Sequence, residues 1–189
     1  MAATEPVRLG YVSWRPPDLT ICWVRADDLA AHGLEARLIG ADRLFAVSTG
    51  TGTSAVPAKD TSVLVDADTA TWDSWNRYAE EFARDTGARV VRVDDGGIIG
   101  PAFFDHVRRL RRPVVNSPKG QTAPVPPDLA RRPVVDPAPY WTWALVSRRD
   151  ETRMAVRAAV EALTRDVGGL GLDAEAAWLP AGDPFRTAG

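Results

Sequence analysis

The chain has 189 residues, of which 45% are hydrophobic and 25% charged, and its formal net charge is −2. These values are typical of a globular protein with a sizeable core, and they exclude the basic field that holds a phosphate backbone, so we expect no direct nucleic-acid binding. The single cysteine, Cys22, cannot form an internal disulfide. The opening segment "MAATEPVRLG" lacks the pattern of a secretory signal, and no apolar run reaches membrane-spanning length, so we predict a cytoplasmic protein without membrane contact.

Short strands dominate the predicted structure of the first fifty residues. Apolar and β-branched segments predict strands at 7–14 and 19–25, and a helical turn that ends at Gly33 follows them. Two further strands are predicted at 34–39 and 43–48. The next segment, "TGTGTSAVPAKD", is expected to be flexible. It lacks the Gly-Lys-Ser/Thr ending of a phosphate loop, which favours a hinge over a nucleotide site.

The clearest helix is predicted for "TATWDSWNRYAEEFARDTG", between a strand at 62–68 and a terminating Gly87. Thr69 or Thr71 is expected to cap its first turn. The same free backbone N–H groups could instead bind an anion beside two tryptophans, and the sequence leaves the capped helix and the anion site equally open. The apolar stripe of this helix consists of Trp72, Trp75, Ala79 and Phe82.

Another strand, helix and strand follow, with the strands at 88–93 and 112–117 and the helix opened by Pro101. The second strand leads into a proline-rich loop. Because strands and helices alternate along the chain, the sequence predicts an α/β fold with a largely parallel sheet. The stripe of the predicted helix consists of Phe103 or Phe104, Val107 and Leu110.

The segment "YWTWALVSRRDETRMAVRAAVEALTRDV" at 140–167 predicts a strand, a turn and a closing helix. Trp141 and Trp143 share one face of the strand, as a period of two requires. We interpret Arg148 and Arg149 as turn residues rather than a nucleic-acid patch, and we expect Asp150 to cap the helix. Its inner stripe is predicted to be Val156, Val160, Leu163 and Val167.

Few side chains suggest a metal or catalytic centre. His32 and His106 are far apart in the sequence and Cys22 has no CxxC partner, so we expect neither a metal site nor a cofactor. Two pairs of aspartates could act as acid and base, although turn formation and helix capping explain them better. These pairs are Asp66 with Asp68 and Asp94 with Asp95.

Two segments of the chain resemble the effector-binding domain of LysR-type transcriptional regulators. "LTICWVRADDLAAHGLEARLIGADRLFAVS" resembles a strand of the type "DLALVR" followed by "GLEARPL…LVAV". "YWTWALVSRRDETRMAVRAAVEAL", at 140–163, resembles the closing strand and helix of that domain. The order of the elements between them also agrees, so the resemblance covers about 19–167 and rests on a distributed pattern.

The resemblance implies a two-lobed α/β fold of the periplasmic-binding-protein type 2 class, with a ligand cleft at the lobe junction. It implies a discontinuous lobe I at 1–48 and 134–170, a lobe II at 49–133 and an irregular C-terminal tail at 171–189. "RPP" joins "VRLGYVSW" directly to "LTICWVR". About two helices and a strand of the family's first lobe are therefore missing, and we expect a reduced first lobe.

The same resemblance implies which residues contact the ligand. Hydroxyl and amide side chains after strand ends are usual contacts in this family, and an arginine there can pair with a carboxylate. The tryptophans favour a small organic ligand with an aromatic body. The residues implied are Ser13, Trp14, Arg25, Thr69, Thr71, Trp72, Asn116 and Ser117.

Three functions remain open at this stage. The first is a stand-alone effector-binding domain that regulates through a small organic ligand, a partner regulator or a homodimer. It would not bind DNA directly, because no segment resembles the family's winged helix-turn-helix. The second is a lyase or dehydratase, since "RLGYVSW" faintly resembles the start of chorismate dehydratases; Asp66 or Asp68 would then supply the acid or base. The third is an interaction module without a ligand.

Overall fold

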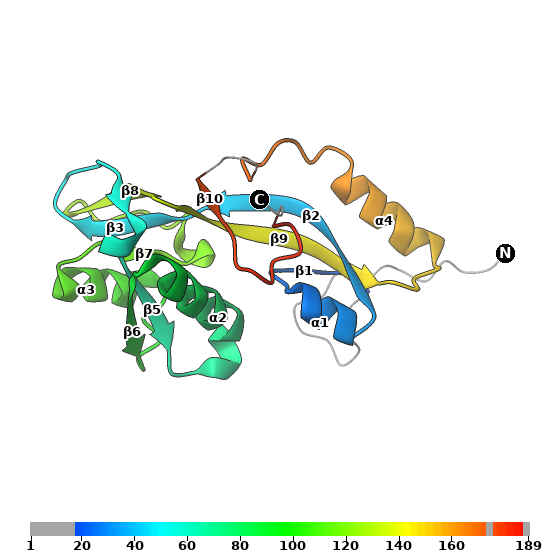
Figure 1. Cartoon of the computed structure of the whole chain (residues 1–189), viewed down its shortest axis with the longest axis horizontal. Helices are drawn as coiled ribbons and strands as arrows, with labels where there is room; N and C mark the ends of the chain where they lie inside the picture. Colours follow the sequence, from blue (N-terminus) through cyan, green and yellow to red (C-terminus); the bar gives the residue numbers. More distant parts are fainter. Residues whose placement is uncertain (1–17, 173–175, 187–189) are drawn as a thin grey trace. The chain divides into compact units, whose positions relative to one another are not determined.

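The computed structural model of the protein shows an α/β fold with two sheets, divided into two compact units (Figure 1). The strand predicted at 7–14 lies outside the residues that the structure describes. The described residues are 18–172 and 176–186, of which unit 1 takes in 18–42, 142–172 and 181–186, and unit 2 takes in 43–141 and 176–180.

Unit 1 is a small sheet with one helix on each face. Strand β1 pairs antiparallel with β9, with Ile21 opposite Leu145, and β2 also pairs with β9. Its elements are β1 (Thr20–Cys22), α1 (Ala26–Ala31), β2 (Leu34–Arg43), α4 (Met154–Thr164) and the greater part of β9 (Ala138–Arg148). The helical turn predicted before Gly33 is confirmed, and the strand predicted at 19–25 is confirmed in shorter form.

Successive side chains of β9 point to opposite faces of this sheet, and each face has its own apolar cluster. Leu145 clusters with Val156 and Val160 of α4. Ala144 clusters with Leu29 of α1, and Figure 1 shows the two helices on opposite sides of β9. The alternation along β9 therefore decides which helix covers which face.

The start of α4 differs from the prediction. Asp150 lies in the turn after β9 and does not cap the helix, which begins four residues later. Instead, the Glu151 carboxylate accepts the N–H of Arg153 at 2.7 Å and its guanidinium at 2.6 Å, which holds this segment extended before the first turn. Leu163 is 48% exposed and Val167 follows the end of the helix, so the inner stripe is shorter than predicted.

Unit 2 contains a six-stranded sheet in the order β4-β8-β3-β7-β5-β6. Its strands are β3 (Phe45–Thr49), β4 (Val56–Pro57), β5 (Ser62–Asp66), β6 (Arg89–Val93), β7 (Val114–Val115) and β8 (Leu129–Val135). Its helices are α2 (Thr69–Thr86) and α3 (Gly100–Leu110), with short 3-10 turns η1 (Ala58–Asp60) and η2 (Pro118–Gly120). Strands β7, β5 and β6 are parallel, but β3 is antiparallel to both of its neighbours, so the sheet is mixed rather than largely parallel.

Three segments that were expected to lack regular structure contain strands. The glycine-rich stretch after β3 includes β4 and η1, and the proline-rich loop gives way to β8 at Leu129. The C-terminal tail includes β10 (Ala177–Trp178), which runs parallel to the first residues of β9. The prediction of an irregular tail is therefore wrong for these residues.

The core of unit 2 beside α2 is aromatic. Tyr78 is 1% exposed and lies 5.8 Å from the ring of Trp75 and 5.1 Å from that of Trp141. Trp178 of β10 packs edge-on against Tyr78 and against Phe82, at 5.2 and 5.1 Å between ring centroids. Much of the tryptophan content thus serves packing, because these rings bury large areas against one another.

Candidate functional site at the carboxyl edge of unit 2

The order of the strands in unit 2 marks one position as suited to a ligand. From β5 the chain passes through α2 to β6 on one side, and it then returns through α3 to β7 on the other side of β5 (Figure 1). The strand order therefore reverses between β5 and β7, and in open α/β sheets ligands bind outside the carboxyl ends of the strands at such a point. We call the residues there the carboxyl-edge site: Asp66, Asp68, Trp72, Asn116, Ser117 and Lys119.

Asp66, the last residue of β5, is 2% exposed and rigidly held. The Asn76 side chain accepts the N–H of Asp66 at 2.9 Å and donates to its carbonyl at 2.8 Å. Oδ1 of Asp66 accepts the N–H of Asp68 at 2.8 Å. Its other oxygen, Oδ2, is buried and has no hydrogen-bond partner among the described residues, an arrangement that costs free energy unless a donor is supplied.

The residues after β7 brace a tight turn. Nδ2 of Asn116 donates to the Gly120 carbonyl at 2.9 Å, and Nε2 of Gln121 donates to the Asn116 carbonyl at 2.7 Å. Two buried atoms of this segment, Oδ1 of Asn116 and Oγ of Ser117, have no partner among the described residues. Gly120 lies directly against Oδ1 of Asn116, and a Cβ at this glycine would collide with it. The turn thus presents buried polar atoms on a fixed backbone.

Helix α2 is capped by a residue that the sequence prediction did not select. The Asp68 carboxylate accepts the N–H groups of Ala70 and Thr71 at 3.1 and 3.2 Å, so the prediction of Thr69 or Thr71 as the cap is wrong. Hydrogen bonds from Thr71, first its hydroxyl and then its N–H, lower the pKa of Asp68. Asp68 stands directly before the helix and its carboxylate accepts two N–H groups of the first turn, so the chain itself occupies these donors.

Trp72 and Lys119 connect the start of α2 to the turn after β7. Nζ of Lys119 lies 5.3 Å from the centroid of the Trp72 ring, within cation–π range. Trp72 is half-buried and its backbone departs from helical geometry, at φ −113° and ψ 15°. By contrast, Trp75 is 4% exposed and its indole N–H donates to the Leu64 carbonyl at 2.8 Å, so only the first of the two tryptophans can form a wall of the site.

Arg25, another predicted contact, lies in unit 1 and packs against the C-terminal segment. A Cβ at Gly182 would stand 2.5 Å from a guanidinium nitrogen of Arg25. The next residue, Asp183, is 4% exposed and accepts hydrogen bonds from the Trp23 indole at 3.2 Å and the Thr142 hydroxyl at 2.7 Å. Arg25 therefore borders a buried contact that holds this segment on unit 1.

The structure brings together some of the predicted contacts and not others. Ser13 and Trp14 lie outside the described residues, and Arg25 belongs to unit 1. Lys119 was not among the predicted residues, although its position after the β7 strand could have indicated it. The predicted contacts that lie together in unit 2 are Thr69, Thr71, Trp72, Asn116 and Ser117.

Two further observations concern the part of the chain that the structure describes. It contains no group of three or more His, Cys, Asp and Glu side chains that could hold a metal ion. None of its helices is long and apolar enough to cross a membrane.

No family model matches the sequence, and no curated protein matches it. Solved structures do match. The reduced OxyR regulatory domain from Pseudomonas aeruginosa has a TM-score of 0.53 at 13% identity, over 80% of this chain and 72% of that one. An OxyR mutant from Corynebacterium glutamicum has a TM-score of 0.53 at 14% identity, over 79% of this chain and 47% of that one. CbnR, a LysR family transcriptional regulator, has a TM-score of 0.53 at 13% identity, over 81% of this chain and 53% of that one.

The protein therefore has the fold of a LysR-type regulatory domain, a two-lobed α/β fold of the periplasmic-binding-protein type. This confirms the fold class and the resemblance predicted from the sequence. The chain spans about half of the length of the longer regulators that it matches, at 47% and 53%.

Proposed function

We propose that the protein is an effector-binding regulatory domain that takes a small organic ligand at the carboxyl-edge site and acts through a partner protein without binding DNA itself. The observation that carries the proposal is the position of Asp66 and Ser117. Each presents a buried polar atom without a partner among the described residues, at the point where the strand order of unit 2 reverses. Such atoms gain most from a ligand that completes their hydrogen bonds.

The chemistry of the site favours a particular kind of ligand. Oδ2 of Asp66 calls for a hydroxyl or amine donor. The half-buried ring of Trp72 offers a flat apolar surface for an aromatic or aliphatic body, and Lys119 above it favours an electron-rich group. We therefore propose a hydroxylated or aminated aromatic compound as the class of ligand.

An enzymatic role is less well supported by the same residues. A general acid or base is expected to have a pKa near the working pH. The pKa of Asp68 is lowered, and its carboxylate serves as a helix cap. Asp95, a member of the second aspartate pair, accepts hydrogen bonds from the His106 ring and the Gly97 N–H, and these also lower its pKa.

A thermal-shift screen with hydroxylated and aminated aromatic acids tests the proposal, because a ligand that binds only the folded state raises the melting temperature. For any compound found, we expect Lys119→Gln and Trp72→Ala to weaken binding by about tenfold, the loss of one good polar or stacking contact. Lys59→Gln is the matched control, since Lys59 is an exposed lysine of η1 in the same unit. A broad panel without a single stabilising compound, or binding that neither site variant weakens, would contradict the proposal.

A further inference from the structure

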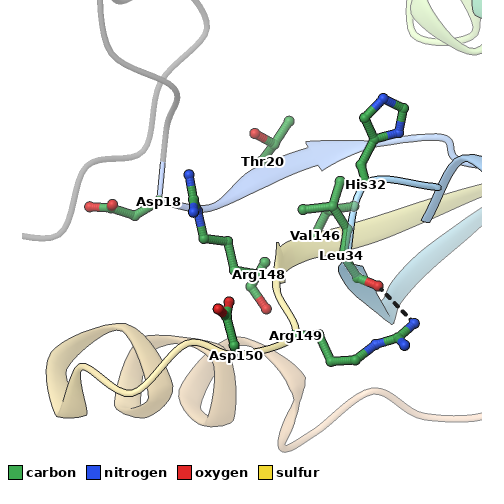
Figure 2. Close-up of a pocket in the computed structure, with 10 residues that line it drawn as sticks. Asp18, Thr20, His32, Leu34, Val146, Arg148, Arg149 and Asp150 are labelled. Atoms are coloured by element: carbon green, nitrogen blue, oxygen red, sulfur yellow. Dashed lines mark hydrogen bonds between the residues drawn. The ribbon is translucent and has the colours of Figure 1, made fainter. Parts of the chain in front are cut away.

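Unit 1 contains a pocket at the end of its sheet where β1 and β2 begin and β9 ends (Figure 2). Its volume is about 620 Å³, within the range of sites for small organic molecules. It is lined by Asp18 and Thr20, by the turn 32–33 with Leu34 at the start of β2, and by the end of β9 with the turn that follows it, 146–150. We call it the strand-end pocket. All of these residues belong to unit 1, so the pocket is separate from the carboxyl-edge site.

Some of the charged side chains around the strand-end pocket have hydrogen-bond or ion-pair partners among the described residues, and Arg148 does not. Asp18 is paired outside the pocket, with its carboxylate 2.7 Å from the Arg153 guanidinium. The Arg149 side chain donates to the Leu34 carbonyl at 3.4 Å, and Figure 2 shows it turned to that side. The Arg148 guanidinium makes no hydrogen bond or ion pair with any residue that the structure describes, and it extends toward Asp18 and Thr20 (Figure 2). Arg148 is therefore the cation of this pocket with unused donors.

The remaining lining is apolar where the strands meet, and an imidazole stands at the turn beside them. Val146 of β9, which is 7% exposed, lies opposite Thr20 of β1, and Leu34 opens β2 beside them. His32 stands at the turn before β2, where its Nδ1 lies 2.8 Å from the Asp28 carbonyl. That hydrogen bond places a proton on Nδ1, so Nε2 is left for another partner.

We propose that the strand-end pocket is a second ligand site, which takes a small organic anion. Arg148 binds the carboxylate or phosphate group, because its planar fork can make two parallel hydrogen bonds to such a group. Val146 and Leu34 contact the apolar body of the ligand. Inorganic phosphate alone would leave the apolar floor and most of the volume unused, so the site favours an organic anion over a bare one.

The negative charge of Asp150 allows a test of whether the ligand is an anion. Its carboxylate lines the same pocket, and Figure 2 shows it near Arg148 and Arg149. An anionic ligand is repelled by this carboxylate and attracted by Arg148. Removing the charge of Arg148 should therefore weaken binding of the anion, and removing the charge of Asp150 should strengthen it. The affinity of a ligand that binds through apolar contact alone would change in neither case.

In the experiment, the full chain carries labelled methyl groups and is titrated with phenyl phosphate while its NMR signals are followed. Inorganic phosphate and phenol are titrated separately for comparison. We expect saturable shifts of the Val146, Leu34 and Thr20 methyl signals with phenyl phosphate. Inorganic phosphate or phenol should bind at least about tenfold more weakly, since each offers only one of the two contacts. Arg148→Gln should weaken phenyl phosphate by about tenfold or more and Arg148→Lys by less, while Asp150→Asn should strengthen it by about two- to fivefold.

Arg165→Gln is the control for net charge, because Arg165 is an exposed arginine of unit 1 outside the pocket. It should leave the affinity unchanged. The proposal is overturned if phenyl phosphate gives no saturable shift up to about 10 mM, a concentration at which even a weak site is largely occupied. It is also overturned if the shifts fall on unit 2 instead, or if Arg148→Gln and Arg165→Gln behave alike. These results do not depend on whether the carboxyl-edge site binds a ligand, since the two sites lie in different units.

Discussion

Trp72 and Trp75 lie three positions apart on α2, yet only one of them is a core residue. Helical spacing predicts both on the same stripe, because it assumes a regular helix from the first turn. The backbone at Trp72 is not helical, and its ring meets Lys119 instead of the core. Spacing alone could not reveal this, since the departure depends on the contact with the turn after β7.

Alanine substitutions should separate these two roles. Trp75→Ala is expected to lower the free energy of unfolding by about 3–5 kcal/mol, because it removes a buried aromatic ring and its hydrogen bond. Trp72→Ala should cost about 1 kcal/mol, since its ring is half-buried at the edge of the core. Urea unfolding of both variants measures this, and equal losses would place Trp72 in the core after all.

The contribution of Asp68 to stability is expected to depend on pH. Its pKa is lowered in the folded protein, so the ionised cap contributes stability above the unfolded pKa of about 4, and that contribution is lost as the pH falls through the folded value. Asp68→Ala should therefore lower the melting temperature at pH 7, and the difference from the wild type should narrow below about pH 4. Melting curves from pH 7 to pH 3 test this. A constant difference would show that the charge of Asp68 has no role.

At the scale of elements, long periodic segments were predictable and short strands were not. Helices α2 and α3 follow from spacing and from glycine and proline signals. Strand β8 was hidden because Pro133 lies within it. Since β4 pairs only with Val134 and Val135, most of β8 is an edge, where proline is tolerated. Strand β10 has only two residues, which are too few to show the alternation of apolar and polar positions that predicts a strand.

The C-terminal segment should depend on Asp183. Its Oδ2 accepts both the Trp23 indole and the Thr142 hydroxyl, and its Oδ1 accepts the N–H of Phe185 at 2.9 Å. Asp183→Ala leaves these buried donors without their partner and should cost about 2–4 kcal/mol of unfolding free energy. Asp183→Asn keeps an oxygen acceptor and should cost less. Chemical denaturation compares the two, and equal losses would indicate that the carboxylate oxygens are not what holds the segment.

At the scale of the whole molecule, the fold was predictable although the identity to structures of known fold is only 13–14%. A fold depends on the pattern of buried and exposed positions, which survives when most residues change. The candidate site was predictable in part. Trp72, Asn116 and Ser117 were indicated by the resemblance. The contact of Lys119 with Trp72 and the pocket beside Arg148 each join segments that are distant in the sequence, which no local pattern encodes.

Exposed apolar side chains of α4 bear on the proposed contact with a partner. Met154 and Leu163 are 85% and 48% exposed, and because they stand nine positions apart they lie on opposite sides of the helix. We expect Met154→Glu with Leu163→Glu to leave the melting temperature within a few degrees of the wild type, because both side chains are already exposed. If either side of α4 mediates self-association, sedimentation should show about tenfold weaker dimerisation of this variant. Unchanged association would exclude α4 from the contact.

The tight packing of Gly120 against Asn116 has a consequence for sequence variation. Any side chain at Gly120 would collide with Oδ1 of Asn116, while Nδ2 of Asn116 needs the Gly120 carbonyl. The two positions are therefore expected to change together or not at all during evolution. A homologue with alanine at the glycine position should carry a smaller side chain in place of the asparagine. The pair offers a signature for recognising distant relatives that keep this turn, where overall identity is too low to reveal them.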